Sequence, residues 1–137
     1  MKKHILFIIL LYFLFSSKVY AASFKWTSVG INEGDTEWFY DRKTVFKVGD
    51  YRYYWILANY LKNIEDDIFS VIGHHMVNCT TQETKWITYT SYNSPMGRGE
   101  MIDSWIIPEI DLEYFQWEYW DYETSIYGQL IKEVCEE

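Results

Sequence analysis

Proline and cysteine are scarce in this 137-residue sequence, with two of each, and basic residues are few beside acidic ones. Twelve Lys and Arg against 20 Asp and Glu give a formal net charge of -8. This charge argues against a nucleic-acid-binding protein, because such proteins neutralise phosphates with a basic patch. It also disfavours a polybasic attachment to anionic lipid. Long Pro-, Gly- or Ser-rich linkers and internal repeats are absent too, so the length fits one folded domain.

The apolar run at the start of the chain, Ile5 to Phe15, is too short to cross a bilayer, which requires about 20 residues. Two lysines precede it, and Val19 and Ala21 place small side chains where signal peptidase requires them. We therefore predict a secretory signal peptide cleaved after Ala21, with cleavage after Ala22 as the second choice and an uncleaved anchor as the alternative. No cysteine stands at this point, so a lipoprotein signal is not predicted.

The predicted division is a signal peptide over residues 1–21 and a mature domain over residues 22–137. Processing removes three of the 12 basic residues and none of the 20 acidic ones, which deepens the net charge from -8 to -11. Aromatic residues make up 20% of the chain, and most of them belong to the mature part. The sequence leaves open whether the exported protein is periplasmic, displayed at the cell surface or secreted.

The two cysteines, Cys79 and Cys135, both lie in the predicted mature domain. Two cysteines in an exported chain most simply form one disulfide. Free thiols or a metal pair are the alternative, but neither cysteine has a CxxC motif or a histidine at metal-ligand spacing.

Short strands dominate the predicted secondary structure. The segment Tyr51 to Leu61 alternates regularly and is apolar on both faces, so we expect it in the centre of the sheet with something covering each side. Short connections between successive strands favour an antiparallel meander. The candidate strands are Phe24 to Val29, Glu37 to Tyr40, Val45 to Val48, Tyr51 to Leu61, Phe69 to Cys79, Lys85 to Tyr92 and Glu100 to Ile107.

The C-terminus changes period and predicts a helix. Thr124 or Ser125 can cap it, and apolar residues from Ile126 to Val134 repeat at helical spacing. Cys135 lies on the apolar side of this helix, so a disulfide to Cys79 would hold the helix against the sheet.

Few residues indicate catalysis or metal binding. His74 and His75 are adjacent in a strand and should point to opposite faces, so they cannot easily share one metal ion. The sequence has no GxSxG motif and no calcium loop. Acidic residues between Asp111 and Glu123 could supply a glycosidase pair, but nothing positions two of them at a fixed separation. Gly97-Arg98-Gly99 is read as a tight turn, with anion binding as the alternative. We therefore expect no catalytic residue, metal or cofactor.

One segment near the C-terminus concentrates aromatic residues, six of them between Tyr114 and Tyr122. Exposed, it could stack on sugar rings or anchor a protein partner, since aromatic side chains dominate binding hot spots. Buried, it would cover the sheet, and both alternatives remain open. The candidate binding residues are Tyr114, Trp117, Tyr119, Trp120 and Tyr122.

The sequence resembles the surface-adhesin protein E-like family of small exported Gram-negative bacterial proteins. The resemblance follows the mature chain in order, and its most specific element is a Ser-Pro-Met-Gly-x-Gly turn together with the two cysteines. The residues that carry it are Trp26, Phe39-Tyr40-Asp41, the strand Trp55 to Lys62, Ser70, Cys79, the segment Tyr92 to Glu100, and Val134-Cys135.

This resemblance implies an α+β fold: a single antiparallel sheet of about six strands with a C-terminal α-helix tethered by a Cys79–Cys135 bridge. It also implies a homodimer and a surface adhesin that binds host extracellular-matrix proteins. Two departures limit the analogy, because the chain lacks a lipid-bearing cysteine and its acidity opposes adhesion through a basic patch. No binding residue transfers from the family.

We therefore predict a non-enzymatic exported protein of the bacterial envelope that binds an unidentified macromolecular partner, protein or glycan. The alternative is a periplasmic module that binds a carbohydrate or small ligand through Trp117 and Trp120.

Overall fold

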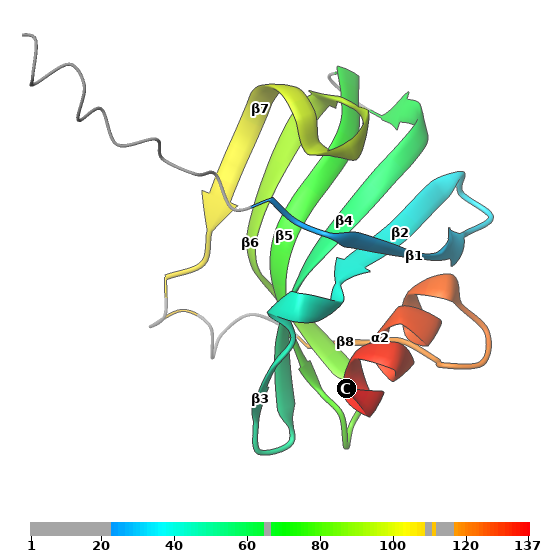
Figure 1. Cartoon of the computed structure of the whole chain (residues 1–137), viewed down its shortest axis with the longest axis vertical. Helices are drawn as coiled ribbons and strands as arrows, with labels where there is room; N and C mark the ends of the chain where they lie inside the picture. Colours follow the sequence, from blue (N-terminus) through cyan, green and yellow to red (C-terminus); the bar gives the residue numbers. More distant parts are fainter. Residues whose placement is uncertain (1–22, 65–66, 109–110, 112–116) are drawn as a thin grey trace, which may run out of the picture.

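The computed structural model describes residues 23–64, 67–108, 111 and 117–137 (Figure 1). The predicted cleavage site at Ala21 and the candidate binding residue Tyr114 lie outside these ranges. The described strands are β1 (Trp26–Ile31), β2 (Thr36–Asp41), β3 (Phe46–Val48), β4 (Tyr51–Ile64), β5 (Ile68–Asn78), β6 (Glu83–Ser94), β7 (Arg98–Ile106) and β8 (Glu118–Tyr119). The helical elements are η1 (Arg42–Thr44), η3 (Pro95–Gly97) and the C-terminal α2 (Ile126–Glu136).

All the strands described here form one antiparallel sheet in the order β1-β2-β4-β5-β6-β7, which confirms the predicted meander. The expected number of about six strands is wrong, because the described part of the sheet has eight. Two of the eight are short segments, β3 beside β4 and β8 beside β6. β3 lies along the same side of β4 as β2, and β8 along the same side of β6 as β7, so eight strands occupy six positions across the sheet.

Strand β4 lies between β2 and β5, the central position that its two apolar faces predict. Tyr54 and Ile56 are fully buried on one face, where they pack with residues of α2, and we call this face the helix side. Leu57 points to the opposite face and packs with Phe39 and Ile72 in a second, smaller cluster. We call this opposite face the open face.

Helix α2 forms as predicted and covers one part of the helix side. The Ser125 side chain caps it by accepting a hydrogen bond from the Gly128 N–H at 2.8 Å. Leu130, Ile131 and Val134 repeat at helical spacing and are completely buried. The helix makes its main contacts with β1, β2 and β4, and Figure 1 shows it beside β1 and β2, away from β7.

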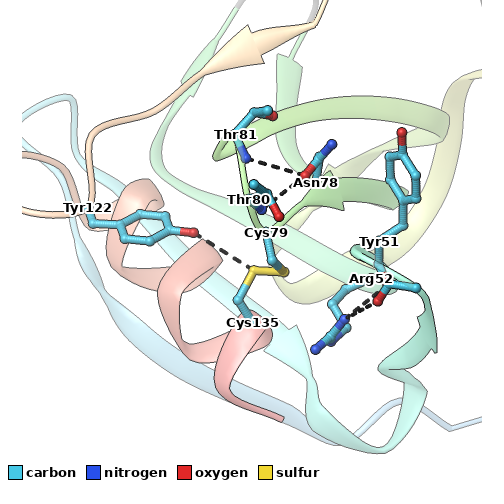
Figure 2. The surroundings of a disulfide bond; sticks show 9 residues. Tyr51, Arg52, Asn78, Cys79, Thr80, Thr81, Tyr122 and Cys135 are labelled. Atoms are coloured by element: carbon cyan, nitrogen blue, oxygen red, sulfur yellow. Dashed lines mark hydrogen bonds between the residues drawn. A yellow bond between two sulfur atoms is a disulfide. The ribbon is translucent and has the colours of Figure 1, made fainter.

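The predicted disulfide between Cys79 and Cys135 is present and joins the end of β5 to the last turn of α2 (Figure 2). The two Cα atoms are 5.7 Å apart, within the usual range for a disulfide. The Tyr122 hydroxyl donates a hydrogen bond to Cys135 Sγ at 3.8 Å. The bridge therefore tethers the helix to the sheet at a point where a third segment also contacts it.

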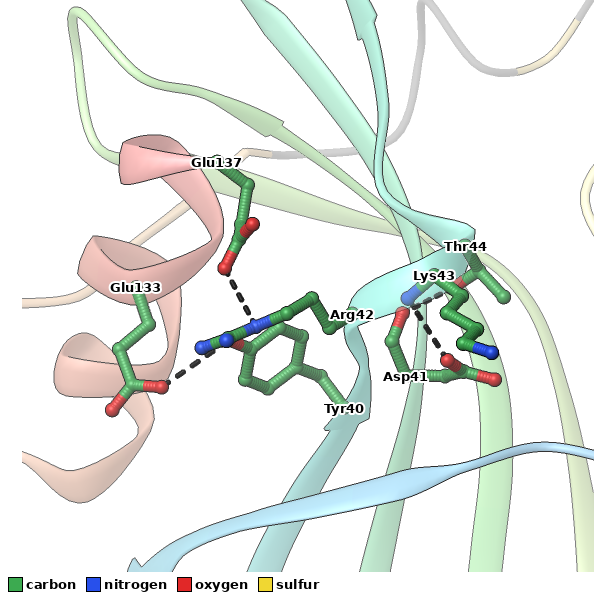
Figure 3. Close-up of polar contacts among 7 residues, drawn as sticks. All are labelled: Tyr40, Asp41, Arg42, Lys43, Thr44, Glu133 and Glu137. Atoms are coloured by element: carbon green, nitrogen blue, oxygen red, sulfur yellow. Dashed lines mark hydrogen bonds and ion pairs between the residues drawn. The ribbon is translucent and has the colours of Figure 1, made fainter.

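Polar contacts attach α2 to the sheet on its other side as well (Figure 3). Arg42 Nε lies 2.7 Å from Glu137 Oε1, and the Tyr40 hydroxyl donates to Glu133 Oε2 at 3.3 Å. The Arg42 side chain is 60% exposed, so this ion pair is screened by solvent. The disulfide and these polar contacts therefore meet the helix near its C-terminal end, and the covalent bridge is the main constraint on it.

Candidate functional site

The aromatic residues predicted to bind a partner differ in their exposure to solvent. Tyr119 is 64% exposed on the short strand β8, whereas Trp120 and Tyr122 pack partly buried against the helix-side core. The Trp120 ring lies 4.8 Å from Tyr127 of α2 in an edge-to-face arrangement. Trp117 and Trp120 therefore contribute to separate clusters and do not form one stacking platform.

Trp117 joins an aromatic surface that extends beyond the predicted segment. Its ring stacks on Tyr51 at a centroid separation of 6.0 Å. The Lys85 ammonium lies 4.5 Å from the centre of the Trp117 ring, a cation–π contact. Trp117 is thus held by two contacts and remains half-buried.

The open face of the sheet carries a line of stacked rings. Trp26 stacks on Phe24 at 4.8 Å, and Phe24 lies 5.3 Å from Trp55. The Trp55 ring stacks in turn on His74 at 5.0 Å, and His74 lies 6.2 Å from Tyr53. All five rings are half-buried, so each presents part of its surface to solvent.

The hairpin of β3 and β4 extends this line with its most exposed members. Phe46 is paired with Tyr53 and is 64% exposed, and Val48 is paired with Tyr51 and is 48% exposed. Residues paired across two strands point to the same face, so these side chains continue the line of rings. We call the whole set the aromatic array: Phe24, Trp26, Phe46, Val48, Tyr51, Tyr53, Trp55, His74 and Trp117.

The regular alternation predicted from Tyr51 to Leu61 is confirmed, and it brings Tyr51, Tyr53 and Trp55 to one face of β4. It did not reveal that the array is exposed, because both faces of β4 are apolar and a single helix could cover either one. The exposure follows from the contacts of α2 with the opposite face, which no local sequence signal encodes.

The two adjacent histidines lie on opposite faces, as predicted. His74 belongs to the array, and partial burial lowers its pKa, so its ring is neutral at pH 7. His75 is completely buried on the helix side, where its Nδ1 lies 2.6 Å from the Tyr127 hydroxyl. Within the part of the chain that the structure describes, no three His, Cys, Asp or Glu side chains gather where they could hold a metal ion.

The Gly97-Arg98-Gly99 segment covers the end of the short helical turn η3 and the first two residues of β7. Gly97 and Gly99 have φ angles of 66° and 80°, which glycine adopts without strain. The Gly97 N–H donates to Ser70 Oγ at 2.9 Å, and the Met96 N–H donates to Asn59 Oδ1 at 2.8 Å. These backbone groups hold the turn to the sheet and are not available to an anion.

Two of the acidic residues considered for a glycosidase pair lie in ordinary structural positions, one in a turn and one on a strand. The Asp121 carboxylate accepts a hydrogen bond from the Glu123 N–H at 2.8 Å, in the turn before α2. Glu118 is exposed on β8, and Glu113 lies outside the described residues.

Comparison with known proteins supplies the family. Residues 26–136 match the family model described as "Surface-adhesin protein E". Similar solved structures include a crystal structure of protein E from non-typeable Haemophilus influenzae, with 12% sequence identity and a TM-score of 0.49, covering 88% of this chain and 79% of that one. A selenomethionine form of Haemophilus influenzae protein E has 12% identity and a TM-score of 0.48, covering 84% of this chain and 96% of that one.

Neither curated sequences nor the helices described here add a further assignment. Comparison with curated protein sequences gave no significant match. Among the residues described above, no helix has the length and apolar character needed to cross a membrane. The family match extends from β1 to the end of α2. Because it covers most of the sequence, the chain belongs to the surface-adhesin protein E family.

Proposed function

We propose that this protein is an exported, non-enzymatic, adhesin-like protein of the bacterial envelope that binds a protein partner through the aromatic array. The observation that carries the proposal is the continuous line of half-exposed rings on the open face. Membership in an adhesin family supports a function in surface recognition.

The composition of the array suits a protein interface. Aromatic side chains are enriched in binding hot spots, where they bury a large area with little loss of conformational freedom. Exposed apolar surface that extends over several residues marks interaction sites in soluble proteins. Phe46 and Val48 lie at the exposed end of the array and project from a two-stranded hairpin, where a partner can reach them.

The array also explains how an acidic protein could recognise a partner without a basic patch. Its rings and apolar side chains carry no charge, and the lowered pKa of His74 keeps that ring neutral at pH 7. Binding would therefore depend on apolar burial and vary little with salt, unlike binding through charged patches.

Export and location form part of the proposal. The predicted signal peptide over residues 1–21 would deliver the domain over residues 22–137 to the envelope, where the disulfide forms in an oxidising compartment. A host extracellular-matrix protein is the expected class of partner, and a second copy of the chain is the alternative occupant of the array. Fractionation of intact cells would show whether the protein is periplasmic, surface-bound or released.

Binding of the purified protein to immobilised extracellular-matrix proteins, measured with and without substitution of Phe46 by Ala, tests the proposal. Phe46 is 64% exposed, so its truncation should leave the fold intact and weaken binding by roughly tenfold or more, as for a hot-spot residue. Ile31→Ala is the matched control, because Ile31 is 51% exposed but lines a hollow beside α2.

Three outcomes would contradict the proposal. They are equal loss of binding in Phe46→Ala and Ile31→Ala, no loss in Phe46→Ala, and absence of any matrix partner. Loss of binding in Tyr119→Ala alone would move the site to β8. Sedimentation of the wild type and Phe46→Ala separates self-association from recognition of another protein.

A further inference from the structure

A pocket of about 430 Å³ lies on the helix side of the sheet, separate from the aromatic array. Helix α2 packs mainly on β1, β2 and β4, and the pocket lies beyond it on the same face, lined by residues of β4, β5, β6 and β7. Val71 and Ile107 are buried apolar residues of the pocket lining. Its aromatic lining comes from three different strands: Tyr60, Trp86, Tyr89 and Trp105.

Two of these rings stand next to each other on neighbouring strands. Tyr89 of β6 is paired with Trp105 of β7, and their ring centres are 5.7 Å apart with planes inclined at 46°. The Tyr89 hydroxyl donates to Asp103 Oδ2 at 2.8 Å, which fixes the orientation of the phenol ring. The two rings therefore form adjacent, angled sides of the pocket.

A third ring, that of Trp86, is held in place by contacts with Gly73 and His75 of β5. A Cβ atom added at Gly73 would come within 2.3 Å of Trp86 Cζ3, so the indole lies directly on a backbone that carries no side chain. The His75 ring meets the same indole at a centroid distance of 3.7 Å. Trp86 is therefore a rigid surface, and a ligand need not spend binding energy on ordering it.

The charges at this pocket favour a cation. Glu118 is exposed and lines the pocket, Asp103 holds Tyr89, and the whole chain has a net charge of -8. Lys85 also belongs to the lining, but its ammonium lies over the Trp117 ring at 4.5 Å. Among the described lining residues, Lys85 is the one cationic side chain, so an anionic ligand would lose its hydration in a largely apolar aromatic site.

We propose that this pocket binds a small quaternary ammonium compound. The faces of Trp and Tyr rings attract cations through the ring quadrupole, and several rings around one site suit a methylated ammonium, which has no N–H to donate. The exposed Glu118 carboxylate adds a charge at the rim. This function is independent of the aromatic array, which lies on the opposite face.

Titration of the purified protein with choline chloride at constant ionic strength tests the proposal, with tryptophan fluorescence and calorimetry as the two readouts. The matched probe is 3,3-dimethylbutan-1-ol, which has the same shape as choline without the charge. Choline should bind saturably and at least roughly tenfold more tightly than this alcohol. Equal binding of the two would show an apolar pocket only, and no binding of choline would overturn the proposal.

Substitutions locate the site. Trp105→Ala should weaken choline binding by roughly tenfold, whereas Ile31→Ala, at an exposed residue outside both sites, should leave it unchanged. Glu118→Gln removes one exposed carboxylate and should weaken choline binding severalfold without affecting the alcohol. Glu123→Gln makes the same charge change in the exposed turn before α2 and is the control.

The two glutamate variants keep the test decisive if Trp105→Ala fails to fold. If choline binding weakened equally in Glu118→Gln and Glu123→Gln, the loss would be due to the change in net charge, and the proposed site would be wrong. Choline binding that persists in Phe46→Ala would separate this pocket from the proposed partner site, so either proposal can fail without the other.

Discussion

The Tyr127 hydroxyl and His75 Nδ1 lie 2.6 Å apart in the core between α2 and β5. Both residues are buried, His75 completely, and the hydrogen bond links the helix to the sheet in the middle of apolar surroundings. Burial holds the pKa of His75 well below its usual value, and the neighbouring His74 lowers it further. The helix is therefore packed on a neutral imidazole.

Stability should fall in mild acid because of this histidine. Above the unfolded-state pKa of about 6.5, His75 is neutral in both the folded and unfolded states and adds no pH dependence. Below it the unfolded chain takes up a proton that the folded protein excludes, so the free energy of unfolding declines by up to about 1.4 kcal/mol per pH unit. Urea unfolding between pH 5 and pH 8 measures this slope.

The variant His75→Phe keeps an aromatic ring in the core but cannot titrate. It should be less stable at pH 8, because it lacks the hydrogen bond to Tyr127, yet its stability should depend less on pH than that of the wild type. His74→Gln is the control and should keep most of the slope, since burial lowers the pKa of His74 less. An unchanged slope in His75→Phe would assign the acid sensitivity to other groups.

Loss of the disulfide should release the end of α2. Cys79 and Cys135 are separated by 56 residues, and closing a loop of this length is worth about 4 kcal/mol in the chain-entropy model. The double variant Cys79→Ser, Cys135→Ser should lose stability by roughly that amount, measured by urea unfolding. Thiol labelling of the denatured, unreduced wild type should detect no reactive cysteine. Labelling without reduction would contradict the bridge.

The sequence was sufficient for features that depend on local periodicity. Alternation identified β4 as a central strand, and the spacing of apolar residues after Ser125 identified α2. The two-residue strand β8 is too short to produce an alternating pattern, so it was not predicted. Burial of Trp120 was one of two alternatives that the sequence left open, because it depends on contact with Tyr127 in an element that follows it along the chain.

The candidate sites were less predictable than the fold. The pocket brings together Tyr60, Trp86, Tyr89 and Trp105, which belong to β4, β6 and β7 and share no sequence motif. Their association depends on strand register and on the position of α2, which packs mainly on β1, β2 and β4. Aromatic density in the sequence drew attention to residues 114–122, but density alone does not separate rings that pack in a core from rings that face solvent.

Gly73→Ala tests the support beneath Trp86. The new methyl group would approach Trp86 Cζ3 to 2.3 Å and the Thr88 carbonyl oxygen to 2.6 Å, and the second neighbour is backbone that cannot move aside. Such overpacking usually costs about 1–3 kcal/mol. The free energy of unfolding should fall by this amount, and the tryptophan emission should change as the indole is displaced.

Gly34→Ala provides the comparison for this substitution. Gly34 is exposed, and an added Cβ would meet the Asn32 side chain at ordinary contact distances of 3.4 and 4.0 Å, so stability should change little. If Gly73→Ala and Gly34→Ala proved equally stable, Trp86 would not be seated on the backbone of β5, and the rigidity assigned to the pocket would be lost.

Adjacent residues at the end of β2 should differ sharply in their contribution to stability (Figure 3). Asp41 is 4% exposed, and its carboxylate accepts hydrogen bonds from the Lys43 N–H at 3.0 Å and the Lys25 N–H at 2.9 Å. Asp41→Ala leaves both backbone donors without their partner and should cost about 1–3 kcal/mol. Arg42→Ala removes a solvent-exposed ion pair with Glu137 and a long hydrogen bond, of 3.4 Å, to the Tyr40 hydroxyl, and should have little effect on stability. Urea unfolding of the two variants gives the comparison. A larger loss of stability in Arg42→Ala would mean that the contacts of Arg42, and not the Asp41 carboxylate that binds the Lys25 and Lys43 amides, stabilise this corner of the sheet.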